Sequence, residues 1–546
     1  MGAHPSEVVT REKVARPQSE MLGGGLFAVS CAGVAMPKDA SAGNSSLGCA
    51  ADDGPYAAIG ENMSDAKFVE DLVDKDDFAQ WYLNLVYKAG LADESPVRGC
   101  MTIKPYGYAL WENMQRAMDD RIKATGHENA YFPLFIPSSF LEREAEHVEG
   151  FAPEVAVVTR AGGEELTEPL VVRPTSETLI GHMYAKWVQS YRDLPLLLNQ
   201  WCNVVRWEKR TRPFLRTTEF LWQEGHTVHR TEEDAERETL LILTDVYLDF
   251  FLRELAIPGI PGLKTESQKF PGALRTYTIE AMMGDGKALQ SATSHNLGQN
   301  FAHSFDIKFQ DADGDVKHAW TTSWGSSTRM VGGLIMVHGD ESGLRMPPRV
   351  APIQAMIVPI WRKEAEREKV AELVEEVERA LRGAGVRVRA DWREERPGFK
   401  YNDWELKGVP IRIEIGPRDA QNGQVVLVPR TNRAAKESVS KDAVAQRVPE
   451  LLGEIHQTLF DSALAFRKSR TYQVTSYDEF REIMADKQRL GFIEAWWCGD
   501  GDCEAVIKDD TQATIRCLPL EHPEGSGLCV RCGRPAAAWA IFAKAY

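Results

Sequence analysis

The chain lacks a long uninterrupted apolar run. No stretch reaches the roughly 18 to 20 apolar residues that a helix needs to cross a bilayer, so we expect no membrane partner. Residues 21–36 come nearest and, with the basic residues before them, faintly resemble a signal peptide. Their glycine content and distance from the N-terminus argue against export, and a cytoplasmic protein is expected.

Net positive charge is also missing. The chain has 64 Lys and Arg against 80 Asp and Glu, a formal net charge of −16. This balance argues against a protein that coats nucleic acid by bulk attraction, and no DNA partner is expected. It leaves room for local basic patches that bind RNA or phosphate, because steering depends on where charge lies.

Cysteine is scarce except at one place. The chain has nine cysteines, and five of them lie in residues 498–532. Crowding in an otherwise cysteine-poor intracellular chain indicates metal before disulfide. Two pairs, Cys498-x4-Cys503 and Cys529-x2-Cys532, predict a closed tetrahedral zinc site of four thiolates. Free thiols are the alternative, and two further ligands stay open: Cys517 and His522.

The length of 546 residues is too great for one core, so several domains are expected. Residues 1–62 are small, polar and glycine-rich, which predicts a disordered extension and makes Met63 a candidate initiator. Residues 63–347 mix helices and strands without alternation, as in an α+β domain on a mostly antiparallel sheet. Residues 348–465 alternate strand with helix and predict an α/β domain. Residues 466–546 form a third module with the cysteine cluster.

Local patterns give more detailed expectations. Helical spacing begins with Phe68 and Leu72, and an amphipathic helix should end at Gly126. In residues 290–301, QSATSHNLGQNF, we expect a polar turn. A helix should present one apolar face made of Val370, Leu373, Val374, Val377 and Leu381. Four stretches of the first domain are strand-like: residues 170–174, 196–208, 276–282 and 334–339. For the last of these, an apolar run after Arg329, a helix is the alternative.

The most informative segment is RWEKRTRPFLRTTEFLWQEGH, residues 206–226. Strand-like sequences flank a polar loop and predict a β-hairpin. Alternate residues of a strand share a face, so Arg206 and Glu208 should lie together on the first strand. The second strand should present one row: Arg216, Thr218, Phe220, Trp222, Glu224 and His226. The remaining cations are interpreted as solvated loop-tip charges: Lys209, Arg210 and Arg212.

Such a surface suits a ligand with an anionic part and a small apolar part, because an arginine fork donates two hydrogen bonds to phosphate. Elsewhere, RPTSET offers Thr175 and Glu177, and a buried carboxylate needs a cationic partner such as a substrate ammonium. The polar run at 290–301 adds Gln290, Thr293 and His295, and small residues precede Arg329. Each of these signals is weak when taken alone.

Together these segments resemble the three motifs of class II aminoacyl-tRNA synthetases. Almost the whole chain after the first 62 residues resembles prolyl-tRNA synthetase of the archaeal and eukaryotic type. Motif 1 is the helix that ends at Gly126 with AYFPLFIP, and it implies a homodimer interface. Motif 2 is RWE (206–208) with RTTEF (216–220), and motif 3 is GSSTR, ending in Arg329.

The resemblance implies a proline–tRNA ligase, which converts L-proline and ATP to prolyl-adenylate and pyrophosphate and then charges the 3′ end of tRNA(Pro). ATP is expected with Mg²⁺, and the catalytic residues would be Arg206 and Arg329. The implied ATP-binding residues are Arg206, Glu208, Arg216, Phe220, Gln290, Thr293 and Arg329. The implied proline-binding residues are Thr175, Glu177, Arg206, Trp222, His226, Phe270 and His295.

The resemblance also implies the order of domains. A class II catalytic domain on an antiparallel sheet would be followed by an α/β anticodon-binding domain and a small α+β domain with structural Zn²⁺. In relatives the carboxylate of the terminal tyrosine, here Tyr546, approaches the active site. Candidate anticodon contacts are Lys400, Glu405, Lys407 and Arg418, and the zinc ligands would be Cys498, Cys503, Cys529 and Cys532.

Two absences refine the resemblance. Threonyl relatives carry a zinc-binding cysteine where this chain has RPTSET. Bacterial-type prolyl enzymes carry an editing insertion between motifs 2 and 3, but only 99 positions separate His226 from Gly325. We therefore expect mischarging of alanine or cysteine without correction in cis, since apolar pockets reject smaller substrates weakly.

Two other functions remain as alternatives. One is a catalytically silent, RNA-binding or regulatory protein with the synthetase fold. The phosphate-binding arginines argue against it, because Arg206, Arg216 and Arg329 are all present. The other is an enzyme of the same class that activates threonine, serine, glycine or histidine instead.

Overall fold

The computed structural model describes residues 72–147 and 155–546 of the chain. The predicted extension, residues 1–62, and the candidate initiator Met63 lie outside the described residues. The first described helix is α1 (Phe78–Lys88), which buries Trp81 and Leu85. Phe68, where the predicted helical spacing begins, lies outside the described residues. No helix of the described residues is long and apolar enough to span a bilayer.

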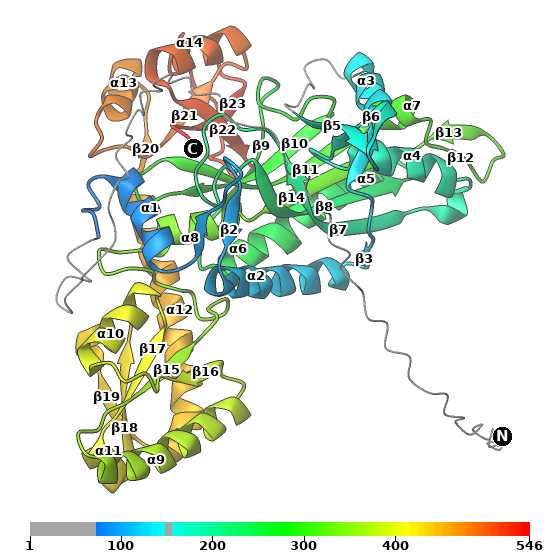
Figure 1. Cartoon of the computed structure of the whole chain (residues 1–546). Coiled ribbons are helices and arrows are strands. Elements are labelled where there is room, and N and C mark those ends of the chain that lie inside the picture. The colour runs from blue at the N-terminus through cyan, green and yellow to red at the C-terminus, as the bar shows by residue number, and fades with distance from the viewer. Residues whose placement is uncertain (1–71, 148–154) are drawn as a thin grey trace, which may run out of the picture. The chain divides into compact units, whose positions relative to one another are not determined.

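An eleven-stranded sheet organises the first domain and the C-terminal module (Figure 1). Neighbouring strands are antiparallel except for two parallel pairs, β3–β7 and β20–β21, which confirms the predicted antiparallel architecture. In spatial order the strands are β20 (Thr471–Gln473), β21 (Phe492–Trp497), β23 (Ala538–Ala543), β22 (Thr514–Pro519), β9 (Ile260–Leu263), β10 (Arg275–Met282), β11 (Ala288–Gly298), β14 (Trp320–Ser327), β8 (Glu219–His229), β7 (Leu196–Val205) and β3 (Glu128–Asn129).

Helices cover one face of this sheet and share one apolar core with it. In α2, Leu110, Met114, Met118 and Ile122 recur every fourth residue and are fully buried, as a core-facing helix stripe requires. The covering helices are α2 (Pro105–Ala124), α5 (Glu232–Leu241), the π-helix η2 (Ile242–Leu248), α6 (Asp249–Arg253) and α8 (Arg329–His338). The opposite face of β8 is polar and bears the site described below.

A small subdomain precedes the hairpin in the chain. Its three-stranded antiparallel sheet has the order β4 (Phe135–Pro137), β6 (Glu164–Val172) and β5 (Ala156–Ala161). Helix α4 (Glu177–Trp187) follows and begins at one of the predicted site residues.

Residues beyond α8 form a separate five-stranded sheet with helices, the predicted α/β domain. Its first three strands are parallel and its last two pair antiparallel, so the sheet is mixed. Helix α9 (Glu364–Gly383) buries the five apolar residues that its spacing predicted. The strand order is β16 (Val388–Ala390), β15 (Ala355–Pro359), β17 (Ile411–Ile415), β18 (Gln424–Pro429) and β19 (Glu437–Ser440), and the other helices are α10 (Pro397–Leu406), α11 (Pro417–Asn422) and α12 (Val444–Ser469).

The C-terminal module is not a separate sheet. Its strand β22 pairs with β9, so β20 to β23 extend the main sheet of the first domain (Figure 1). Helices α13 (Tyr477–Ala485) and α14 (Gly501–Thr511) belong to this module. Because α12 runs as one helix to Ser469, it crosses the predicted boundary between residues 465 and 466.

One open alternative of local structure is decided and one prediction is wrong. Residues 334–339, which the sequence left as a strand or a helix, are mostly the second half of α8, because a short run that is buried on all sides has no period to separate helix from strand. Residues 290–298, predicted as part of a polar turn, belong to strand β11. Their alternating polar side chains line a cavity instead of meeting solvent.

Candidate active site

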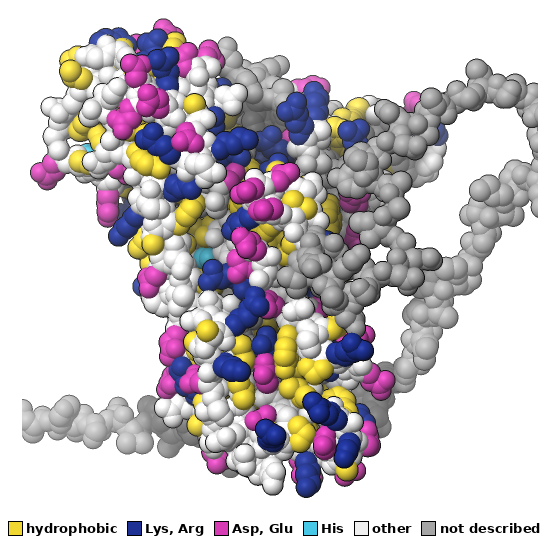
Figure 2. Space-filling model, turned by 90° about the vertical axis from the view of Figure 1, so that its left-hand side faces the viewer, with side chains coloured by type: hydrophobic (Ala, Val, Ile, Leu, Met, Phe, Trp, Pro, Cys, Tyr) yellow, Lys and Arg dark blue, Asp and Glu magenta, His cyan; other side chains and the backbone are white. Residues whose placement is uncertain are grey.

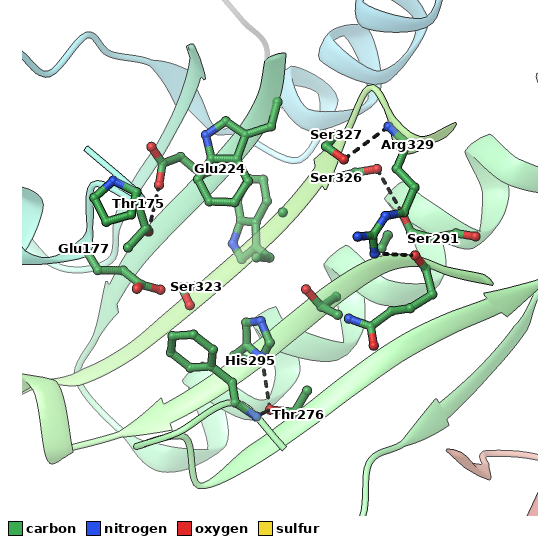
Figure 3. A pocket seen from close by; sticks show the side chains of 18 of the residues that line it. Thr175, Glu177, Glu224, Thr276, Ser291, His295, Ser323, Ser326, Ser327 and Arg329 are labelled. Carbon is green, nitrogen blue, oxygen red and sulfur yellow. Dashed lines mark hydrogen bonds between the residues drawn. The ribbon is translucent and has the colours of Figure 1, made fainter. Parts of the chain in front are cut away.

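A cavity of about 530 Å³ opens on the polar face of the main sheet (Figure 3). Strands β8, β10, β11 and β14 form its floor, and residues 174–177 and 268–271 form parts of its wall. The cavity brings together predicted residues that lie far apart in the sequence: Thr175, Glu177, Arg206, Phe220, Trp222, His226, Phe270, Gln290, Thr293, His295 and Arg329.

The predicted hairpin places the arginine and the aromatic residues on one face. Val204 pairs with Phe220 across β7 and β8, and the backbone N–H of Arg206 donates to the Thr218 carbonyl at 2.8 Å. The Arg206 guanidinium lies 5.5 Å from the Phe220 ring and 5.2 Å from the Trp222 ring. Arg206 is accessible from the cavity, although the protein around it desolvates the guanidinium and lowers its pKa. The two strand faces therefore coincide as predicted.

One end of the cavity carries carboxylates (Figure 3). Glu224 is buried, and its Oε1 accepts hydrogen bonds from the Ser176 hydroxyl at 2.6 Å and from Gln200 Nε2 at 3.0 Å. The Thr175 hydroxyl donates to Glu224 Oε2 at 3.4 Å. Burial raises the pKa of Glu224, but hydrogen bonds from His226 and Ser176 outweigh burial and lower the pKa to about 2. Glu224 is therefore ionised and already has its partners.

Glu177 is different from Glu224. It begins helix α4, is buried, and points into the cavity toward Ser323 (Figure 3). Its Oε2 has no hydrogen-bond partner among the described residues. Burial raises the pKa of Glu177, and the nearby Glu224 carboxylate raises it further. A carboxylate oxygen in this state provides a place for a ligand that can donate a hydrogen bond or carry positive charge.

The wall between the ends of the cavity is partly apolar. The Phe270 ring lies 4.9 Å from the imidazole of His295, whose Nδ1 is 3.0 Å from the Thr276 hydroxyl. Burial lowers the pKa of His295 to about 3, so the imidazole is neutral at physiological pH. Trp222 also lines the cavity, and its indole N–H donates to the Cys202 sulfur at 3.2 Å. Phe270 and Trp222 thus give the cavity an apolar part.

The other end of the cavity is cationic (Figure 3). Arg329, the first residue of α8, donates from Nε to the Leu215 carbonyl at 3.0 Å and from Nη1 to the Gln290 carbonyl at 3.3 Å. Burial, with repulsion from Arg216 and Arg206, lowers its pKa to about 10, which leaves it charged at neutral pH. Two carbonyls therefore orient the guanidinium.

An irregularity in the sheet explains why Gln290 lines the cavity. Ala292 pairs with Ile279 but Gln290 pairs with Glu280, so Ser291 is an extra residue in β11. This bulge places Gln290 on the same face as Thr293 and His295 although their odd spacing in the sequence would put them on opposite faces of a regular strand.

Several predicted residues lie outside the cavity lining. Glu208 and Arg216 do not line it, and their side chains face each other with Oε1 and Nε 3.9 Å apart. Tyr546 does not line it either, but its backbone N–H donates to the Ala288 carbonyl, at the start of β11. The sequence-based reasoning missed Ser176 and Gln200, which hold Glu224. Of these two residues, only Ser176 could have been suspected from the sequence, because it lies inside the RPTSET motif.

The four predicted cysteines form a second site. The sulfur atoms of Cys498, Cys503, Cys529 and Cys532 all lie within 4.8 Å of one another, and α14 carries Cys503. Four thiols this close fit one tetrahedral thiolate-binding metal. The two alternative ligands are elsewhere: Cys517 is buried on β22, and His522 is exposed.

The anticodon candidates differ in accessibility. Lys400 is buried and donates from Nζ to the Asp391 carbonyl at 3.0 Å, and Glu405 is buried beside Arg430. Lys407 is half-buried and forms an ion pair with Asp403, whereas Arg418 is exposed. On the face in Figure 2, basic and acidic side chains are interspersed without a large field of one sign.

Comparisons with known proteins agree with this geometry. Three family profiles match: "tRNA synthetase class II core domain (G, H, P, S and T)" at residues 159–338, "Anticodon binding domain" at 354–451 and "Prolyl-tRNA synthetase, C-terminal" at 477–546. The chain is 58% identical over 474 residues to a proline–tRNA ligase of Roseiflexus sp. (strain RS-1), with 86% of this chain and 98% of the relative covered. It is 57% identical to that of Chloroflexus aurantiacus (strain J-10-fl), with the same coverage.

A solved structure is similar as well. The prolyl-tRNA synthetase of Cryptosporidium parvum, crystallised with halofuginone and AMPPNP, superimposes with a TM-score of 0.84 at 38% identity. The match covers 89% of this chain and 99% of that one.

Proposed function

This chain belongs to the prolyl-tRNA synthetases, ligases that join proline to tRNA, and we propose that its cavity binds L-proline at the carboxylate end and ATP at the arginine end. The observation that carries the proposal is the buried Glu177 Oε2, which has no partner among the described residues. A substrate imino group, which is cationic and donates hydrogen bonds, supplies what this oxygen lacks. The Thr175 hydroxyl is a second contact for the same group.

The apolar wall suits the rest of the amino acid. Trp222 and Phe270 enclose the pyrrolidine ring, together with the neutral His295. His226 supports this end through its contact with Glu224. A five-membered ring fills this space with little exposed apolar surface.

ATP occupies the cationic end in this proposal. Arg206 binds the α-phosphate between the two substrates, and Arg329 and Arg216 bind the γ-phosphate. The adenine stacks between Phe220 and the Arg329 plane, and the ribose side contacts Gln290 and Thr293, with Glu208 nearby. Enzymes of this class use ATP with Mg²⁺, which offsets phosphate charge.

The chemistry then needs no protein nucleophile. The proline carboxylate oxygen attacks the α-phosphorus, the bond to the bridging oxygen breaks, and pyrophosphate leaves. Arg206 and Arg329 stabilise the charge that grows on the phosphate oxygens, and the walls hold both reactants in line. The tRNA 3′-hydroxyl next attacks the carbonyl carbon of prolyl-adenylate, and AMP leaves.

The other domains support this reaction. The α/β domain binds the anticodon of tRNA(Pro), for which Arg418 is the most accessible of the predicted contacts, with Lys407 second and Lys400 and Glu405 as supports beneath. The cysteine cluster holds a structural Zn²⁺ through Cys498, Cys503, Cys529 and Cys532.

The same reasoning extends to subtype and assembly. We assign the chain to the archaeal and eukaryotic subtype, since a C-terminal module of this family follows its anticodon-binding domain. The exposed Tyr131 and Phe135, which belong to motif 1, support a homodimer interface there. We propose the cytoplasm, where translation uses charged tRNA, as its location, with no DNA partner.

The test is ATP–pyrophosphate exchange with each of the twenty amino acids. Proline should support exchange far better than threonine, serine, glycine or histidine. Exchange with none of them would favour the catalytically silent alternative.

A further inference from the structure

The connection between β9 and β10 forms one wall of the proposed proline pocket. Its residues 268–271 line the cavity, and Phe270 contacts the imidazole of His295. Phe270 also packs against Phe301, with ring centroids 6.4 Å apart, and Asn300 donates to the Gly272 carbonyl at 2.9 Å. Hydrogen bonds to Thr265 and Thr276 fix the backbone before and at Phe270. The Thr265 carbonyl accepts from the N–H groups of Gln268 and Lys269 at 3.0 and 2.9 Å, and the Phe270 N–H donates to the Thr276 hydroxyl at 2.9 Å. Thr265 therefore holds the start of the turn that carries Phe270.

The start of this turn is anchored from the C-terminal module. The Thr265 hydroxyl donates to Glu504 Oε1 at 3.1 Å, across 239 positions of sequence. Both residues are buried, at 4% and 6% exposure. Glu504 lies on helix α14, whose neighbouring residue Cys503 belongs to the cysteine cluster. The contact thus joins the metal-site helix to the wall of the amino-acid pocket.

A second buried group holds the preceding residue. Lys264 Nζ donates to Glu280 Oε1 and to the Arg516 carbonyl, each at 2.7 Å. The Arg516 guanidinium donates to both carboxylate oxygens of Glu280 at 3.1 and 3.2 Å. Strand pairing of β22 with β9 continues this attachment. The C-terminal module therefore contacts strand β9 and the two residues that follow it, Lys264 and Thr265.

We propose that Glu504 is a positioning residue for proline recognition, acting through Thr265 on the wall that carries Phe270. The proposal rests on the proline pocket assigned above. In this proposal the C-terminal module contributes to proline recognition in addition to its structural role. Loss of the Glu504 carboxylate leaves the buried Thr265 hydroxyl with Ser267 Oγ, 3.2 Å away within the turn, and removes its hydrogen bond to the C-terminal module, which frees the turn to move away from the pocket.

The position of the wall gives a selective prediction. Phe270 lies at the amino-acid end of the cavity, whereas Arg329 is held by the carbonyls of Leu215 and Gln290, two residues outside the turn. Displacement of the turn should therefore weaken proline binding and spare ATP binding. A general loss of folding would affect both substrates.

The test is ATP–pyrophosphate exchange by the full chain, with proline and ATP varied separately. Glu504→Ala should raise KM for proline about tenfold and leave KM for ATP and the melting temperature near wild type. Glu504→Gln keeps an acceptor oxygen and should restore KM for proline. The matched control is Asp509→Ala, which removes an exposed carboxylate from the same helix and should change neither constant.

Two further measurements separate positioning from general stability. Thr265→Val should reproduce Glu504→Ala, and the double variant should be no worse than either single one, because both remove the same contact. Hydrogen exchange of the backbone amides in residues 266–274 should be faster in Glu504→Ala than in wild type. An unchanged KM for proline with unchanged exchange would overturn the proposal, as would equal increases in both KM values.

The proposed function and this inference can fail separately. Absence of proline-dependent exchange in the wild type would refute the proposed function. The hydrogen-exchange comparison needs no substrate, and equal rates in wild type and Glu504→Ala would refute the anchoring itself.

Discussion

His226 Nε2 lies 3.1 Å from Glu224 Oε2, two residues earlier on the same strand. With Ser176 and Gln200 also bonded to Glu224, this carboxylate has enough donors within the protein. Glu177 is its buried neighbour and keeps an oxygen without a donor among the described residues. The two carboxylates therefore have different roles. Glu224 accepts hydrogen bonds from the protein and fixes the pocket, whereas Glu177 is available to accept a hydrogen bond from the substrate.

Replacement of Glu177 should selectively weaken proline binding. Glu177→Gln removes the charge that pairs with the imino group, so kcat/KM for proline should fall between about tenfold and a hundredfold. KM for ATP should stay near wild type. Exchange assays with each substrate varied check both values, and Glu164→Gln, at an exposed position on β6, is the control. An equal loss for both substrates would contradict this assignment.

The raised pKa of Glu177 predicts a pH dependence. A raised pKa means that the free carboxyl stays protonated to pH values above 4.5, its ordinary value. The cationic proline needs the ionised form, so binding must release this proton. KM for proline should therefore rise as the pH falls through the pKa of Glu177 and level off above it. In Glu177→Gln, KM for proline should no longer rise at low pH. If the rise persists in the variant, another group is responsible for the titration.

Replacement of Arg329 by lysine should impair the use of ATP. Two carbonyl acceptors orient its planar fork, and an ammonium cannot keep both contacts and still bind phosphate and stack on adenine. Arg329→Lys should lower kcat/KM for ATP roughly a hundredfold. Arg210→Lys, at the exposed hairpin tip, should be silent. Near-wild-type kinetics of the Arg329 variant would remove it from the ATP site.

The cysteine cluster predicts a stoichiometry and a stability effect. Elemental analysis of the purified chain should find one zinc ion per chain, and Cys503→Ser should lose most of it. Its melting temperature should fall, because the binding free energy of the metal contributes to the stability of the folded module and is lost with the ion. Cys517→Ser, outside the cluster, should keep the metal. Full metal content in Cys503→Ser would reject the ligand set.

Alanine should be activated and attached to tRNA(Pro). The apolar wall penalises a smaller side chain only weakly, so alanine should be used at roughly a hundredth to a thousandth of the efficiency of proline. Incubation of alanyl-tRNA(Pro) with the chain should leave the ester intact beyond its spontaneous hydrolysis. Rapid deacylation would reveal an editing activity that the short interval between motifs 2 and 3 argues against.

The part of the site that follows strand periodicity was predictable. Phe220, Trp222 and His226 alternate along one strand, and a period of two places them on one face without any tertiary information. The apolar face of α9 was predictable for the same reason. In both places, one side of an element meets the core or a pocket and the other side does not.

Features that depend on distant segments were not predictable. Gln290 joins the cavity through a β-bulge, which shifts the side-chain period without a mark in the sequence. Lys400 was a candidate anticodon contact from the sequence, and the structure buries its aliphatic stem and places a backbone carbonyl on its ammonium. The attachment of β22 to β9 and the Thr265–Glu504 contact are set by packing of the C-terminal module on the catalytic sheet.

The most direct test of the central claim is a crystal structure of this chain with a non-hydrolysable prolyl-adenylate analogue. The ring nitrogen should lie within hydrogen-bonding distance of Glu177 Oε2 and the Thr175 hydroxyl, with the phosphate mimic on Arg206 and the adenine against Phe220. An analogue bound in the reverse direction, or one that leaves Glu177 Oε2 without a donor, would contradict the division of the cavity into an amino-acid end and a nucleotide end.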